Sequence, residues 1–202
     1  MAHEGLWEQL DKLDRHRTAQ RVKCQYMSDP ERYVILLLNT EYVVNLSQRE
    51  IFSLSPASSA VPAGFLEQLS ILTYLINAQD LPLANKLVGA EALPGGQFFF
   101  RGLHSLPTRK LEEAFGDCPQ NLYQLSAQFN AKRREFGDAS IELDVLPRIP
   151  LTIVIWKCDE EFAARASILF DQTATAHLPL DALLAAVNLT VDALVKAVRT
   201  NR

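Results

Sequence analysis

The chain has 202 residues, the size of one ordinary domain with a short extension. Hydrophobic residues account for 48% of the chain and charged residues for 22%, a balance that excludes a disordered protein, a collagen-like repeat and a coiled coil. The net charge of −4 argues against a nucleic-acid-binding protein that acts through a basic surface.

The N-terminal segment predicts a helix, because Leu6, Leu10 and Leu13 recur at helical spacing beside Trp7. We expect this amphipathic helix to cover residues 4–23. The first 30 residues carry charges throughout and show no signal-peptide pattern, so we expect a cytoplasmic protein.

Two apolar runs follow, Arg32–Leu38 and Glu41–Leu46, on either side of the turn-prone pair Asn39-Thr40. This arrangement predicts a β-hairpin. The first run is apolar at successive positions, which is typical of a strand covered on both faces. The apolar runs Tyr33–Leu38 and Leu151–Trp156 have six residues each, whereas a membrane helix needs about 20, so we expect no membrane insertion.

The middle of the chain predicts helices separated by irregular segments. Residues 66–78 are apolar nearly all round, which indicates a buried helix. Residues 80–106 are rich in proline and glycine, and Phe98–Phe100 within them suggests a short strand. Two more helices are expected, over about 108–115 and 120–130.

The last third of the chain contains the clearest patterns. Residues 139–146 alternate between apolar and polar side chains, as in a half-exposed antiparallel strand, and the apolar run 151–156 predicts a second strand. Residues 159–170 fit either a helix or a strand. From Pro179 onward, apolar side chains follow helical spacing for five turns, which predicts a long C-terminal helix packed on a core. These elements indicate an α+β fold: one domain over residues 1–202, with a mainly antiparallel sheet, helices against it, and residues 1–30 as a helical extension.

Several common chemistries are absent from the sequence. The glycines form neither of the phosphate-binding patterns G-x-G-x-x-G and G-x-x-x-x-G-K-[ST], and no G-x-S-x-G elbow is present. The four histidines are too scattered to form a metal-ligand pair. Cys24, Cys118 and Cys158 are too far apart for a disulfide framework or a C-x-x-C site, so we expect three small apolar fillers and no metal or cofactor.

The densest group of chemically useful side chains follows the predicted strand that ends at Trp156. Three adjacent acids there could hold a hard cation or supply a carboxylate pair for acid–base catalysis. Alternatively, the first acid caps a helix or turn, and Asp171 caps another turn. The candidate binding residues in this region are Trp156, Asp159, Glu160, Glu161, Phe162 and Asp171.

The second candidate is the turn at Pro94-Gly95-Gly96-Gln97-Phe98. Proline and glycine suit a tight turn, and such a turn beside aromatic side chains can line a pocket. The alternative interpretation is that the phenylalanines belong to the core. Gly95 and Gly96 are therefore candidate binding residues, and no catalytic residue is assigned.

Five pieces of the sequence together resemble a known family. They are Leu66–Leu75, Leu93–Gly96, Pro147–Trp156, Asp159–Phe162 and Ile168–Asp171. In this order they are similar to the domain of unknown function 3786, a prokaryotic family common in anaerobic bacteria and archaea. The resemblance extends from about residue 33 to the C-terminal helix and is most specific over residues 147–179.

In that family the domain often follows a cysteine-rich module similar to the iron–sulfur domain of corrinoid proteins, and this chain has no such cysteine cluster. The resemblance implies a place in anaerobic metabolism rather than a reaction. We therefore expect a non-catalytic accessory or binding domain that acts beside a redox or corrinoid protein partner. The alternatives are a small metal-dependent enzyme that uses Asp159, Glu160 and Glu161, and a structural subunit of a larger complex.

Overall fold

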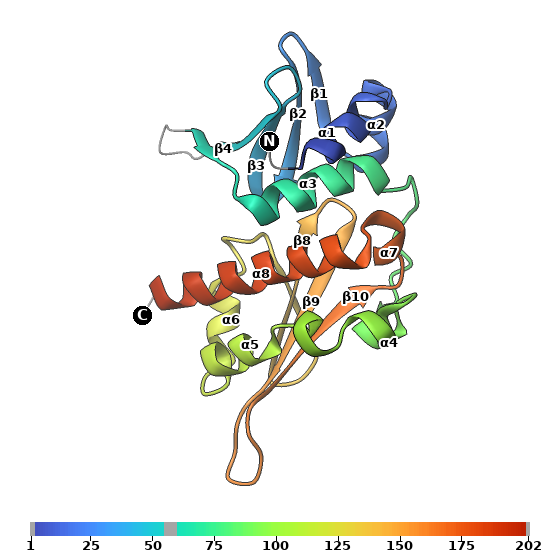
Figure 1. The fold of residues 1–202 in the computed structure, drawn as a ribbon. Coiled ribbons are helices and arrows are strands. Elements are labelled where there is room, and N and C mark those ends of the chain that lie inside the picture. The colour runs from blue at the N-terminus through green and yellow to red at the C-terminus, as the bar shows by residue number, and fades with distance from the viewer. Residues whose placement is uncertain (1–2, 55–59, 201–202) are drawn as a thin grey trace.

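Two five-stranded antiparallel sheets form the framework of the computed structural model, which describes residues 3–54 and 60–200 (Figure 1). In the first sheet the strands follow chain order: β1 (Gln25–Ser28), β2 (Glu31–Leu37), β3 (Thr40–Asn45), β4 (Glu50–Leu54) and β5 (Ala60–Pro62). In the second sheet the order is β6 (Leu87–Val88), β10 (Arg165–Asp171), β9 (Ile149–Trp156), β8 (Ala139–Leu146) and β7 (Lys132–Arg134). The α+β prediction is confirmed, but the division into two sheets was not predicted.

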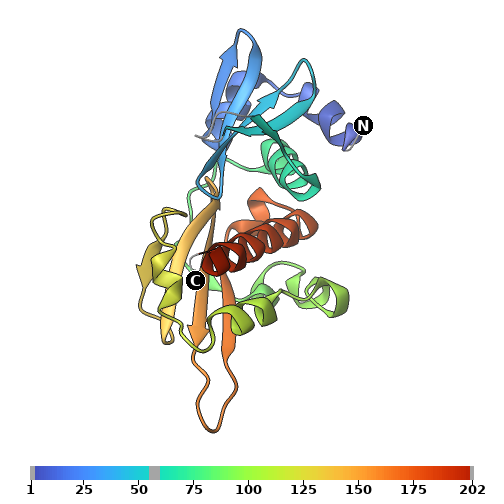
Figure 2. The ribbon, with the colours of Figure 1, turned by 90° about the vertical axis from the view of Figure 1, so that its left-hand side faces the viewer.

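Helices and short 3₁₀ turns connect and cover these sheets. In the N-terminal half they are α1 (Glu4–Asp11), α2 (Arg15–Val22) and α3 (Phe65–Asn77). In the C-terminal half they are η1 (Ala90–Ala92), α4 (Gly96–Phe99), η2 (Gly102–His104), α5 (Thr108–Phe115), α6 (Asn121–Gln124), α7 (Ala174–His177) and α8 (Leu180–Thr200). Both α3 and α8 lie on the same side of the two sheets (Figure 2).

The predicted hairpin is confirmed, with Ile35 of β2 opposite Tyr42 of β3. Its turn passes through Leu38 and Asn39, which have φ angles of 50° and 61°. The prediction that both faces of β2 are covered is wrong, because the side chain of Leu36 is 47% exposed. Tyr33, Ile35 and Val44, on one face of this sheet, are buried, whereas Met27 and Leu36 on the opposite face are exposed.

Three other expectations require correction. The helix predicted over residues 4–23 is divided into α1 and α2, because Asp14 begins a new helix by accepting a hydrogen bond from the Arg17 amide at 2.8 Å. The segment Phe98–Phe100 does not form a strand, since its first two residues close the short helix α4. The helix expected over 120–130 is reduced to α6 and turns.

The predictions for the last third are largely confirmed. Strand β8 occupies the predicted position, but the expectation that it is half-exposed is wrong, because only Asp144 in it is exposed. Strand β9 begins two residues before the predicted run, at Ile149, and β10 resolves the ambiguous segment 159–170 as a loop followed by a strand. The long C-terminal helix is α8. Every residue of β9 except Trp156 is buried, which places this strand at the centre of the second sheet. Among the described residues, no helix combines the length and apolar character required to cross a bilayer.

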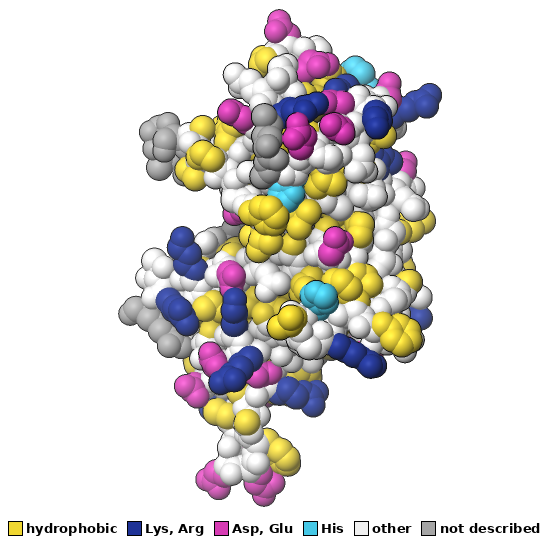
Figure 3. All heavy atoms as spheres, viewed as in Figure 1, with side chains coloured by type: hydrophobic (Ala, Val, Ile, Leu, Met, Phe, Trp, Pro, Cys, Tyr) yellow, Lys and Arg dark blue, Asp and Glu magenta, His cyan; other side chains and the backbone are white. Residues whose placement is uncertain are grey.

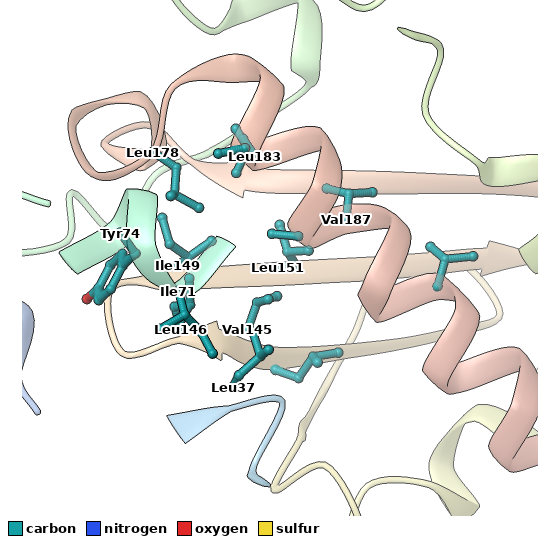
Figure 4. Close-up of a cluster of buried hydrophobic side chains, with 14 of the residues drawn as sticks. Leu37, Ile71, Tyr74, Val145, Leu146, Ile149, Leu151, Leu178, Leu183 and Val187 are labelled. Carbon is teal, nitrogen blue, oxygen red and sulfur yellow. The ribbon is translucent and has the colours of Figure 1, made fainter. Parts of the chain in front are cut away.

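A shared core joins the two halves. Helix α3 runs antiparallel to α8 and packs against it (Figure 1). Ile71 and Tyr74 of α3, Leu183 and Val187 of α8, and Leu151 of β9 converge in this core (Figure 4). Each of these five side chains is 0% exposed. Because the two helices are antiparallel, this packing places the N-terminal end of α3 beside the C-terminal end of α8, where the cleft described below lies.

Candidate functional site

The acidic segment lies on the connection between β9 and β10, which projects from the end of the second sheet (Figures 1 and 2). One carboxylate oxygen of Asp159 accepts hydrogen bonds from the amides of Glu161 at 2.9 Å and Phe162 at 2.7 Å. Glu160 and Glu161 are exposed. Within the described ranges, no three His, Cys, Asp or Glu side chains are grouped so that they could hold a metal ion.

At the base of this loop, a surface pocket of about 400 Å³ brings together three of the predicted residues: Trp156, Asp159 and Phe162. Asp138 and Arg165 also line it. The guanidinium of Arg165 lies 4.5 Å from the centre of the Trp156 ring, a cation–π contact that holds the side of the pocket. The pocket is therefore built from an aromatic ring and charges of both signs rather than from converging acids.

Asp171 lies at the opposite end of β10 from the acidic loop, so it is not part of the same site. One of its carboxylate oxygens accepts hydrogen bonds from the Thr173 hydroxyl at 2.6 Å, the Thr173 amide at 2.9 Å and the Ala84 amide at 3.1 Å. Burial acts to raise the pKa of Asp171, but these hydrogen bonds outweigh it, and the pKa lies below its ordinary value. Asp171 thus joins the turn after β10 to the segment before β6.

Replacing Asp159 by alanine is expected to destabilise the protein by about 1 kcal/mol, because two amides of the loop lose their acceptor. Thermal melts of the wild type and the variant, with chelator and with magnesium, calcium or manganese, measure this effect. Glu160→Ala is the matched control and should be neutral, since Glu160 is exposed. A metal-dependent rise in Tm that Asp159→Ala or Glu161→Ala abolishes would contradict the capping role and favour a cation site.

The second predicted segment, at Gly95 and Gly96, forms a tight turn into α4. Gly95 has a φ angle of 76°, which glycine adopts without strain. A Cβ atom at position 96 would clash with the carbonyl oxygen of Ala90, so only glycine allows α4 to lie this close to η1. Both glycines therefore have a structural reason to be present, and they position the residues that follow.

Those residues form an exposed ridge, which we define as residues 96–105 and call the α4–η2 ridge. Phe98 is 74% exposed and Leu103 is 101% exposed. In the same segment, the ring of Phe99 stacks on His104 with centroids 4.7 Å apart and an interplanar angle of 4°. Hydrophobic side chains gather over α4 at the lower right of Figure 3. Two large apolar side chains are therefore exposed on a segment that also contains an aromatic stack.

A cleft lies between the two halves, beside the N-terminal end of α3 and the C-terminal end of α8. The outline of the molecule is hollowed there, on the left of Figure 3. Its volume is about 480 Å³. The hairpin turn of the first sheet reaches its floor, where the Leu38 amide donates to the carbonyl of Val145 at 3.0 Å and the Asn39 side chain to that of Gln128 at 3.0 Å. The lining residues are Leu37, Leu38, Thr40, Tyr42, Glu67, Gln128, Phe129, Leu189, Asp192, Ala193, Lys196, Ala197 and Thr200.

At the other end of the interface, polar side chains hold the linker between α3 and β6. Buried Arg148, in the turn between β8 and β9, donates to the carbonyls of Arg21 at 2.9 Å and Leu81 at 2.8 Å and to the carboxylate of Asp80. The ring of His177, which is 0% exposed, accepts a hydrogen bond from the Gln79 amide through Nδ1 at 3.4 Å. The two halves are thus tied by hydrogen bonds as well as by the apolar core.

The stability of the protein should fall in mild acid because of His177. Burial, and next the charge of Arg148, hold the pKa of His177 below its ordinary value of 6.5. The His177 ring of the unfolded chain gains a proton near pH 6.5, whereas the ring of the folded protein gains one only at lower pH. The contribution of neutral His177 to the free energy of unfolding is therefore complete above pH 6.5, and it is lost as the pH falls through the pKa of the folded protein. We expect His177→Gln to reduce the decrease in Tm between about pH 7 and pH 5.

The matched control for this experiment is His16→Gln, because His16 is exposed. That variant should retain the pH dependence of the wild type. If both variants show the same curve, His177 is not the group responsible for the loss of stability.

The sequence offered weak signals for some of these features. Arg148 stands out as one charge between two apolar strands, which suggests a buried and paired guanidinium. The sequence shows Phe98 beside a tight turn, but its local pattern does not predict that the side chain is exposed. The cleft had no signal, because Tyr42, Glu67 and Lys196 are far apart in the chain. The expectation that all three cysteines are apolar fillers is wrong for Cys118, which is an exposed free thiol.

Comparison with known proteins places the chain in a family. No curated protein and no solved structure matches it at a significant level. One family model, described as a domain of unknown function (DUF3786), matches residues 14–193. The matched region contains the acidic loop, the α4–η2 ridge, Arg148 and most of the cleft. Because the match spans most of the chain, the protein belongs to the DUF3786 family, as the five pieces of similar sequence predicted.

Proposed function

We propose that this chain is a non-catalytic accessory domain that binds a protein partner through the α4–η2 ridge. The observation that carries the proposal is the exposure of Phe98 and Leu103, at 74% and 101%, on the segment that contains the Phe99–His104 stack. Burying one such side chain in a partner contributes roughly 1.5–3 kcal/mol. Phenylalanine is among the aromatic residues that are enriched at protein–protein interfaces relative to the rest of the surface.

The charges around the ridge indicate what the partner surface should contain. Arg101 contributes an exposed positive charge within the ridge. A complementary partner would therefore present an apolar pocket bordered by acidic side chains, since unlike charges at the rim steer association and discriminate among partners. We propose that this partner is a redox or corrinoid protein of anaerobic metabolism. The family resemblance supports this proposal for the identity of the partner.

The test is capture of the partner from an anaerobic extract of the organism that makes the protein. We expect the wild type to retain a protein that contains iron or a corrinoid, identified by mass spectrometry and absorption spectroscopy. The double variant Phe98→Ser/Leu103→Ser should lose this protein, and with the purified partner its Kd should rise at least about tenfold.

Phe162→Ser supplies the matched control. Phe162 is 69% exposed, comparable to Phe98, but lies on the acidic loop. It should therefore bind the partner like the wild type. Retention of the partner by the double ridge variant, or equal loss with Phe162→Ser, would contradict the proposal.

One observation favours the alternative that the chain is a structural subunit. The strand register places several apolar side chains on the face of the first sheet opposite Tyr33 and Ile35: Met27, Val34, Leu36, Val43, Phe52 and Leu54. Met27, Leu36 and Leu54 are exposed, whereas Val43 is buried. Apolar faces of this kind are usually covered in an assembly. If Leu36→Lys, rather than the ridge variant, releases the captured protein, the subunit alternative is favoured.

A further inference from the structure

The cleft between the halves has the size and composition of a small-molecule site, and it lies apart from the α4–η2 ridge. Its volume of about 480 Å³ falls within the roughly 300–1,000 Å³ typical of such sites. One wall comes from β3 and the first turn of α3, in the N-terminal half. The other wall comes from the last turns of α8 and from the segment around Phe129, in the C-terminal half.

Each wall carries a charge that has no ionic partner. On α8, Asp192 precedes Lys196 by one turn and would be its natural partner, but Asp192 pairs with Lys110 at 2.6 Å instead. Glu67, on the opposite wall, forms no ion pair within 4.0 Å with any cation in the described ranges, and neither does Lys196 with any acid there. A carboxylate and an ammonium therefore line opposite walls of one cleft without neutralising each other.

The surface between these charges combines apolar side chains with polar ones, namely the hydroxyl groups of Thr40, Tyr42 and Thr200 and the amide of Gln128. Leu37 and Phe129 are buried in it, and Leu189 is half-buried. Burial, together with the negative charge of Glu67, raises the pKa of Tyr42 to about 12, so its hydroxyl group stays protonated at neutral pH. Tyr42 can therefore donate a hydrogen bond to a ligand.

We propose that this cleft binds a small zwitterion with an apolar body. Its ammonium group would pair with Glu67 and its carboxylate with Lys196, and its apolar part would cover the half-buried Leu38 and Leu189. A neutral ligand or a ligand with a single charge is less suitable, because it would leave the half-buried Glu67 or the exposed Lys196 without a counter-charge, and it would also take water from the Glu67 carboxylate. A free apolar amino acid and a short apolar peptide share the required chemistry and differ in the distance between their charges.

Isothermal titration calorimetry of the full chain with L-leucine and with the dipeptide leucyl-leucine tests the proposal and separates these two sources. We expect at least one of the two to bind. For the probe that binds, N-acetylation removes the positive charge and C-terminal amidation the negative one. Each change should weaken binding at least about tenfold, as expected for a charged hydrogen-bonded pair.

Variants assign each charge to its wall. Glu67→Gln should weaken binding of the unmodified probe about tenfold and leave binding of the N-acetyl probe unchanged, and Lys196→Gln should do the same for the amidated probe. Glu113→Gln is the matched control, because Glu113 is an exposed acid that pairs with Arg109 and does not line the cleft.

Three results would overturn the proposal: no binding of either probe, equal affinity for the charged and blocked probes, or an effect of Glu67→Gln that is the same for the acetylated and unmodified probes. The double ridge variant Phe98→Ser/Leu103→Ser should bind the probe like the wild type. A failure of the cleft proposal is therefore distinguishable from a failure of the proposed partner binding.

Discussion

Replacing Leu183 by alanine is expected to destabilise the protein by about 2–5 kcal/mol. Leu183 is 0% exposed and lies on α8 in the core shared by both halves (Figure 4). Removing three carbon atoms there loses apolar burial and leaves a cavity that rigid neighbours on β9 and α3 can fill only in part. Urea unfolding, followed by circular dichroism, measures the difference in the free energy of unfolding.

The neighbouring residue provides a matched control, because Leu184→Ala removes the same atoms from a half-buried position. That variant should lose less than half as much stability as Leu183→Ala. Since α3 and α8 share one core, we also expect the two sheets to unfold in a single transition. A loss below about 0.5 kcal/mol for Leu183→Ala would contradict the assigned core, given the range measured for buried leucines.

Replacing Arg148 by methionine should destabilise the protein by about 3 kcal/mol, the second large effect. The guanidinium donates to two backbone carbonyls from different parts of the chain, those of Arg21 and Leu81. Hydrogen bonds from a charged donor contribute roughly 1.5–3 kcal/mol each, and methionine keeps most of the apolar stem while removing both. Chemical denaturation of the two proteins under identical conditions measures the loss.

Asp80→Asn distinguishes the carbonyl contacts from the ion pair. The side chain of Asp80 is 72% exposed, so its pairing with Arg148 is screened by water and should contribute at most about 1 kcal/mol. We therefore expect Asp80→Asn to retain most of the stability. If Arg148→Met and Asp80→Asn lose equal amounts, the stabilisation comes from the ion pair and the argument from the carbonyls is wrong.

Local pattern predicted most of the regular elements in this protein, since each of those elements buries one face. The apolar stripe of α8, the alternation in β8 and the apolar run of β9 each indicated the correct element type. Prediction failed where a single polar contact, or the close approach of one backbone segment to another, determined the local backbone conformation. Asp14 divides the N-terminal helix by capping α2, and Gly96 packs on the carbonyl of Ala90 and turns a run of phenylalanines into a short helix.

The candidate sites could be predicted only in part. The sequence placed Trp156, Asp159 and Phe162 in one segment, and the structure brings them into one pocket. The sequence also grouped Asp171 with them, whereas in the structure the length of β10 separates Asp171 from the acidic loop. Neighbours in sequence are neighbours in space only within a loop or a helical turn, because a strand carries the chain about 3.3 Å away with each residue.

The sequence by itself determined the α+β class, the family and the positions of the main strands and helices, because hydrophobic periodicity and local turn chemistry are properties of short segments. Tertiary structure alone decided that the strands divide into two sheets and that α3 packs antiparallel to α8. It also decided that Glu67 and Lys196 line one cleft and that Phe98 is exposed. These features depend on which surfaces the shared core brings together, and that choice is made by packing between segments distant in the chain.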